Sequence, residues 1–134
     1  MVGSQKKHWF WVWLVQATVA KDDLSSKSAP CEVWANLVII NADDEVQAYA
    51  KALDIGMTYV GDSRGTLRLG SRPATVQFLG VKTMGVIHDD LEDGAEITYE
   101  VIKCSQAEAK ALVRQKEKLL PEVKKELEYK KKSS

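Results

Sequence analysis

The sequence has few of the residues that build metal centres and catalytic sites. It contains two cysteines and two histidines, and Cys31 and Cys104 lie far apart with no Cys-x-x-Cys pair. Zinc sites need several such ligands at close spacing, so we predict no metal and two reduced thiols. Neither glycine-rich phosphate-binding pattern, GxxxxGKS/T or GxGxxG, occurs. We therefore expect no cofactor and assign no catalytic residue.

Long apolar runs are also missing. No stretch approaches the roughly 20 apolar residues of a membrane-spanning helix. The longest aromatic run, Trp9–Val15, is short for a secretory signal and is built of tryptophan rather than leucine or alanine. We expect no membrane partner and a cytoplasmic location.

Net charge is absent as well. The 19 basic and 19 acidic side chains cancel, which removes the overall positive potential typical of nucleic-acid-binding proteins. The cancellation hides an asymmetry, because residues 105–134 carry 9 Lys or Arg against 5 Asp or Glu, whereas residues 1–104 carry 10 against 14. The composition therefore indicates an acidic body with a basic tail and disfavours nucleic acid as a partner.

The stretch His8–Ala20 concentrates three of the four tryptophans and one of the two phenylalanines. Alternation along a strand puts its tryptophans on one side and Phe10, Val12 and Leu14 on the other. Since both sides are apolar, the strand is either covered on both faces or presents an aromatic face to a partner. The tryptophans of this strand and the next are the candidate partner-binding residues: Trp9, Trp11, Trp13 and Trp34.

The remaining periodicity predicts further strands at 33–41, 75–87 and 95–103, with short edge strands within 57–70. A helix begins at Asp44, where Gln47 can reach back to the backbone N–H of the capping residue, and Gly56 suits the left-handed position after its last turn. Gly80 and Gly85 indicate bulges or the close approach of a tryptophan.

These elements predict an α+β fold of order β-β-α-β-β-β, an antiparallel sheet with one helix packed on a face. A Ser105 capping box opens a C-terminal helix that Pro121 should kink. We expect a single α+β domain at 1–104, followed by the helix and lysine-rich tail at 105–134. The second face of the sheet needs cover, either from the terminal helix or from a second copy of the chain.

Arg64, Arg68 and Arg72 lie at even spacing, so an extended chain would place their guanidinium groups on one face. Such a face could bind anions, although arginines also guard exposed sheet edges against aggregation. Together with the Lys130–Lys132 tail, this face supports an alternative hypothesis of nucleic-acid binding.

The acidic turn His88–Gly94 resembles a calcium loop, but Leu91 occupies a ligand position, so we predict no metal there. His88 could act as a base beside neighbouring carboxylates if a pocket brought them together. This gives a further alternative, a small enzyme that uses His88, Asp89, Asp90 and Glu92.

Residues 9–102 resemble a family of short bacterial proteins catalogued as a domain of unknown function. The resemblance rests on the aromatic first strand, on Ala42–Glu45 leading into an alanine-rich helix, on Phe78–Val81, and above all on Leu91–Glu96. It implies no activity or catalytic residues, because none is assigned to the family. The lysine-rich segment after Ser105 lies outside it.

The leading expectation for function is a non-enzymatic protein–protein interaction or assembly module, which includes an inhibitor or immunity-type role. Its partner would be another protein or further copies of the same chain. The exposed aromatic face, or the acidic turns, would supply the contact.

Overall fold

The computed structural model describes residues 7–133, with side chains as far as Tyr129. The chain divides into two compact units, Met1–Tyr99 and Glu100–Ser134. The division falls slightly before the boundary expected after residue 104. Each unit is described by itself below.

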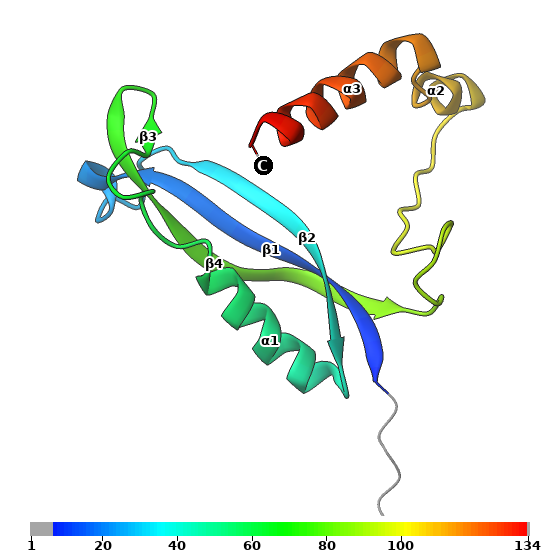
Figure 1. Cartoon of the computed structure of the whole chain (residues 1–134), viewed down its shortest axis with the longest axis horizontal. Helices are drawn as coiled ribbons and strands as arrows, with labels where there is room; N and C mark the ends of the chain where they lie inside the picture. Colours follow the sequence, from blue (N-terminus) through cyan, green and yellow to red (C-terminus); the bar gives the residue numbers. More distant parts are fainter. Residues whose placement is uncertain (1–6, 134) are drawn as a thin grey trace, which may run out of the picture. The chain divides into compact units, whose positions relative to one another are not determined.

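The first unit is an antiparallel sheet in which β1 (His8–Ala20) is central (Figure 1). The strand order is β2-β1-β4-β3, with β2 at Glu32–Ala42, β3 at Arg68–Leu69 and β4 at Arg72–Ile87. A short 3₁₀ turn, η1 (Lys21–Asp23), begins the loop that joins β1 to β2, and because these strands pair antiparallel the loop is the tip of a hairpin. The antiparallel α+β architecture is confirmed.

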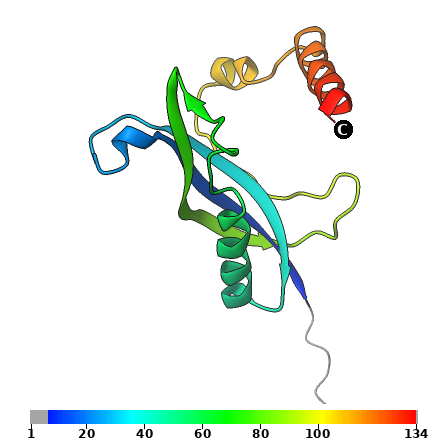
Figure 2. The same cartoon turned by 60° about the vertical axis from the view of Figure 1, so that its left-hand side comes forward.

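The helix α1 (Glu45–Met57) packs across β1, β2 and β4 (Figures 1 and 2). It meets the sheet through alanines, which let the backbones approach closely. Val12 and Leu14 are 0% and 1% exposed, the largest side chains that are fully enclosed. The buried cluster consists of Phe10, Val12, Leu14, Ile40, Ala42, Ala48 and Ala52.

The start of α1 follows the predicted capping pattern with one difference. The Asp44 carboxylate accepts a hydrogen bond from the Gln47 backbone N–H at 2.8 Å. The Gln47 side chain accepts from the N–H of Asp43, at 2.8 Å, and not from that of Asp44. Asp44 is therefore the N-cap, as predicted, and only the hydrogen bond accepted by the Gln47 side chain comes from a different residue, Asp43.

The predicted role of Gly56 is wrong. It lies inside α1, is buried, and does not adopt a left-handed conformation. A Cβ atom at this position would overlap the ring of Phe78 on β4. The glycine is needed because helix and strand touch here, and the helix ends without a left-handed residue at Thr58.

The predictions for Gly80 and Gly85 are confirmed. Gly80 has a φ of 141° and lies at a point where the pairing of β1 with β4 shifts register. Gly85 pairs with Trp11 across the two strands, and a Cβ atom there would overlap the Trp11 indole. One glycine permits a bulge and the other makes room for a ring.

The strand predicted at 95–103 does not form, since the segment has no regular secondary structure. At its beginning, the N–H of Ala95 donates to the Glu92 carbonyl at 2.9 Å and the N–H of Glu96 donates to the Asp89 carboxylate at 3.1 Å. These local hydrogen bonds compete with a sheet ladder. The side chains alternate as predicted, but the first two backbone N–H groups of the segment donate within a turn and not to a neighbouring strand.

The second unit contains α2 (Gln106–Ala111) and α3 (Lys116–Ser133). The Ser105 capping box is present, with Ser105 Oγ accepting from the Glu108 N–H at 3.1 Å. The terminal helix is bent, as predicted, but the break between α2 and α3 precedes Pro121. Pro121 lies inside α3, beyond its first turn, so it removes one backbone hydrogen bond of the helix.

Candidate functional site

The sheet has one face covered by α1 and an opposite face that carries the tryptophans of β1. In the pairing of β1 with β2, Trp11 lies opposite Ile39 and Trp13 lies opposite Leu37. Residues opposite each other lie on the same side of a sheet. Trp9 is 37% exposed, whereas Trp11 and Trp13 are partly buried. We call this surface the tryptophan face; its members are Trp9, Trp11, Trp13, Val15, Val33, Ala35, Leu37 and Ile39.

Trp34 does not belong to this surface. It pairs with Gln16, which places it on the side of the sheet that carries Leu14 and α1. Its Nε1 donates to Glu32 Oε1 at 2.9 Å, and the side chain is half exposed. Three of the four predicted tryptophans therefore share a surface, and the fourth lies on the other side.

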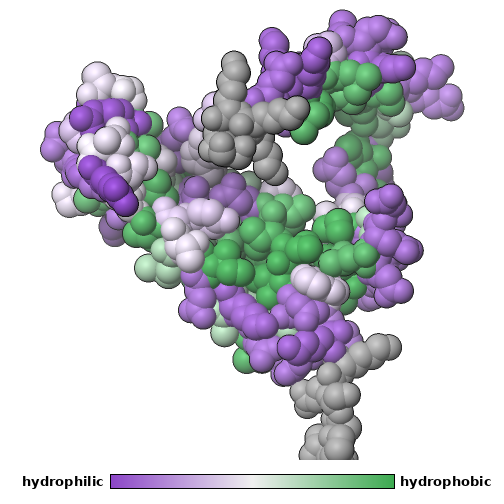
Figure 3. Space-filling view, viewed as in Figure 1, coloured by the Kyte–Doolittle hydropathy of each residue, from purple (hydrophilic) through white to green (hydrophobic). Residues whose placement is uncertain are grey.

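The β2 part of the tryptophan face is the most exposed. Val33, Leu37 and Ile39 are 57%, 39% and 43% exposed. Figure 3 shows hydrophobic side chains gathered over the β1 and β2 part of the sheet. A contiguous apolar surface of this kind is typical of a binding site.

A groove lies at the end of the tryptophan face, beside Trp11 and Gly85. Its volume is about 580 Å³. The loop after β4 forms its other wall, closed by the hydrogen bond between Asp89 and Glu96 described above and by the turn at Gly94, whose φ is 87°. The lining residues are Trp11, Gly85, Val86, His88, Asp89, Glu96, Ile97, Thr98 and Tyr99.

The groove brings together only part of the proposed acid–base group. His88 and Asp89 line it, whereas Asp90 and Glu92 do not. Sequence reasoning missed Glu96 and Tyr99, which the returning loop carries to the groove. The signal was Gly94, which ends the predicted turn His88–Gly94, but the residues after it were predicted to continue as a strand and not to return to the sheet.

In the described part of the chain, no cluster of side chains suited to metal binding or thiol chemistry is present. Within residues 7–133, no three His, Cys, Asp or Glu side chains are grouped so that they could hold a metal ion. Cys31 and Cys104 are both free and exposed. Among the described helices, none is long and apolar enough to cross a membrane.

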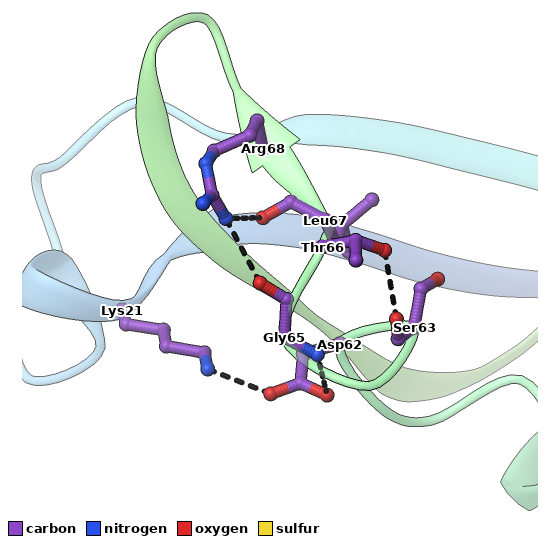
Figure 4. Close-up of polar contacts among 7 residues, drawn as sticks. All are labelled: Lys21, Asp62, Ser63, Gly65, Thr66, Leu67 and Arg68. Atoms are coloured by element: carbon purple, nitrogen blue, oxygen red, sulfur yellow. Dashed lines mark hydrogen bonds and ion pairs between the residues drawn. The ribbon is translucent and has the colours of Figure 1, made fainter.

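The three arginines do not share one face, because the chain from Arg64 to Arg72 is not extended. Asp62 closes a turn by accepting from the Gly65 N–H at 3.0 Å (Figure 4). Arg64 has a φ of 61° within this turn, and Arg68 donates to the Gly65 carbonyl at 3.0 Å. The geometric basis for a shared anion site is therefore wrong.

Arg72 is engaged by acidic groups of the β1–β2 loop. Its guanidinium donates to both carboxylate oxygens of Asp23, at 2.8 and 3.1 Å. Asp22 lies 4.0 Å away. Similarly, Lys21 forms an ion pair with Asp62 at 2.6 Å. These ion pairs hold the hairpin tip against Asp62 and against the first residue of β4, so their role is structural. The side chains of Lys130–Lys132, also part of the predicted basic surface, lie outside the described residues.

Replacing Arg72 with alanine should raise the pKa of Asp23. The hydrogen bond from Arg72, and then its charge, hold the pKa of Asp23 below its ordinary value. An acid with a depressed pKa stabilises the fold above its unfolded-state pKa, and this stabilisation is lost as the pH falls through the folded-state pKa. Carboxyl NMR titration of Arg72→Ala should show the rise.

Glu122 supplies the control for that titration, because its pKa is lowered by Arg114 in the other unit. Its titration should be unchanged in the Arg72→Ala protein. An Asp23 titration identical in the two proteins would contradict the assigned ion pair.

Comparison of the chain with protein-family models, curated proteins and solved structures found no match. The resemblance of residues 9–102 to a bacterial family of unknown function therefore stays a prediction.

Proposed function

We propose that the protein is a non-enzymatic interaction module that binds a partner protein through its tryptophan face. The observation that supports this is the one-sided position of α1. A strand that is apolar on both faces has its Phe10 side enclosed by the helix, while its Trp9 side remains partly exposed. Tryptophan is among the residues that contribute most to binding energy at protein interfaces.

The alternative functions have less support. Nucleic-acid binding relied on a shared arginine face, but Arg72 is paired with Asp23 and the net charge is zero. An enzyme would need its acid–base residues to converge, and only His88 and Asp89 of the proposed set line the groove. The tryptophan face needs no such convergence, because burial of apolar surface alone can drive association.

Trp11→Ala should abolish capture of a specific partner. Loss of a central tryptophan typically costs about 2 kcal/mol or more of binding free energy, roughly thirtyfold in affinity. The tagged full-length chain would be used to capture proteins from cells of its source, with captured proteins quantified by mass spectrometry. Binding of a captured protein would then be measured by titration calorimetry with both proteins purified.

Trp34→Ala is the matched control, since it removes the same side chain from the opposite face. The expected result is a partner that is lost with Trp11→Ala and retained with Trp34→Ala, while circular dichroism shows both variants folded. A folded Trp11→Ala protein that binds the same partner with wild-type affinity would refute the proposal. So would a wild-type chain that captures no protein specifically.

A further inference from the structure

β2 is an edge strand with an outer side that no described strand covers. In the sheet order β2-β1-β4-β3 its only neighbour is β1, and this pairing extends from Glu32 to Ala42. Alternate backbone N–H and C=O groups of an edge strand point away from the sheet and can pair with another strand. Addition of a strand to such an edge is a common mode of protein association.

The residues of β2 do nothing to discourage such pairing. The strand contains one charged residue, Glu32 at its beginning, and neither proline nor glycine. Edge strands that must stay single usually carry charges, prolines or bulges. On the outer side of β2, backbone groups are therefore flanked by exposed apolar side chains on both faces: Val33, Trp34, Leu37 and Ile39.

The opposite edge of the sheet is built differently. β3 and a bridge from Gly61 cover the first part of β4. Further along, β4 carries the charged Lys82 and an irregular register against β1. Val46 and Tyr49 of α1 line a groove with the last part of β4. The contrast between the two edges points to β2 as the edge used for association.

We propose that a second copy of the chain pairs its own β2 antiparallel with this one, about a twofold axis at Leu37. In this register the whole of β2 in one copy pairs with the whole of β2 in the other. Ala35 lies opposite Ile39 of the second copy, and Glu32 lies opposite its Ala42. The two Glu32 carboxylates are then ten positions apart, roughly 33 Å along the strands. That separation exceeds the screening length of about 8–10 Å, so the charges do not repel.

The pairing has a defined geometric result. A twofold axis between antiparallel strands of one sheet is perpendicular to the sheet, so the same face of each copy lies on the same side. Two four-stranded sheets join into one, with both tryptophan faces together. The dimer therefore goes beyond the proposed function, since it presents two partner sites and allows avidity.

Sedimentation velocity over a range of concentrations tests the proposal with the full-length chain. The wild type should sediment as a dimer. Leu37→Lys places two like charges opposite each other on the twofold axis and should raise the dimer dissociation constant at least about tenfold. Circular dichroism should show it folded, because Leu37 is 39% exposed.

Thr83→Lys is the matched control. Thr83 lies on β4 and pairs with Trp13 of β1. The lysine is therefore on the same face of the sheet as Leu37 but away from the β2 edge, and the dimer should persist. A dimer built by stacking two tryptophan faces would be weakened by both substitutions. The proposal would be overturned if both substitutions weakened the dimer. It would also be overturned by a monomeric wild type, or by a Leu37→Lys protein with unchanged self-association.

A disulfide test decides the register even if the lysine variant fails to fold. Leu37→Cys, in a chain carrying Cys31→Ser and Cys104→Ser, should form a disulfide-linked dimer on mild oxidation, because symmetry places the two thiols opposite each other. Thr83→Cys in the same background should not. Absence of the Leu37→Cys crosslink, or equal crosslinking at both positions, would overturn the pairing.

Discussion

Leu14→Ala should lower the free energy of unfolding by about 2–5 kcal/mol. Leu14 is 1% exposed and lies in the cluster between the sheet and α1. Removing the side-chain atoms beyond Cβ abolishes the stabilisation that their burial provides. It also leaves a cavity that the surrounding side chains fill only partly. Since domains of this size are stable by about 5–15 kcal/mol, the loss is a large fraction of the total.

Leu79→Ala is the matched control for this prediction, because it removes the same atoms from a leucine on β4 that is 59% exposed. Its free energy of unfolding should change by no more than about 0.5 kcal/mol. Urea denaturation followed by tryptophan fluorescence measures both variants. Equal losses at the two positions would show that the cluster under α1 is not the core of the first unit.

Gly85→Val should cost about 1–3 kcal/mol of stability, in a strand where valine is otherwise favoured. Gly85 has no left-handed backbone conformation, so the cost is steric. The new side chain would occupy the space of the Trp11 indole. The indole must move, and the near-ultraviolet circular dichroism signal of the tryptophans should change with it.

A double-mutant cycle isolates this contact. In a Trp11→Ala background the space above Gly85 is free, so Gly85→Val should cost little or become stabilising. The same urea titration provides the four free energies of unfolding. A cost of Gly85→Val that is independent of residue 11 would contradict the steric explanation.

The parts of the fold that sequence predicts well are those set by neighbouring residues. The two apolar sides of β1 follow from alternation, and Asp44 and Ser105 follow from the needs of helix starts. The fit between Trp11 and Gly85 was also predictable, because a glycine inside a strand signals a large neighbour.

Several of the errors concern the path of a segment after a local pattern ends. The alternation at 95–103 is typical of a strand, but a strand forms only where a sheet edge and unpaired backbone N–H groups are available. The N–H groups of Ala95 and Glu96 donate within a turn instead. The spacing of the arginines assumed an extended chain that Asp62 folds into a turn. For the same reason Glu96 and Tyr99 could not be placed beside Trp11, since loop closure is set by contacts remote in sequence.

The space at Gly85 also determines how β1 and β4 can align. A shift of the pairing by one residue would turn the core-facing side chains of one of the two strands, β1 or β4, away from α1. A shift by two residues would preserve the faces but would bring Thr83 or Ile87 under the Trp11 indole, where a side chain cannot fit. A missing side chain on β4 thus acts as a register lock for the central strand pair, and the tryptophan face keeps one position along the sheet because of it.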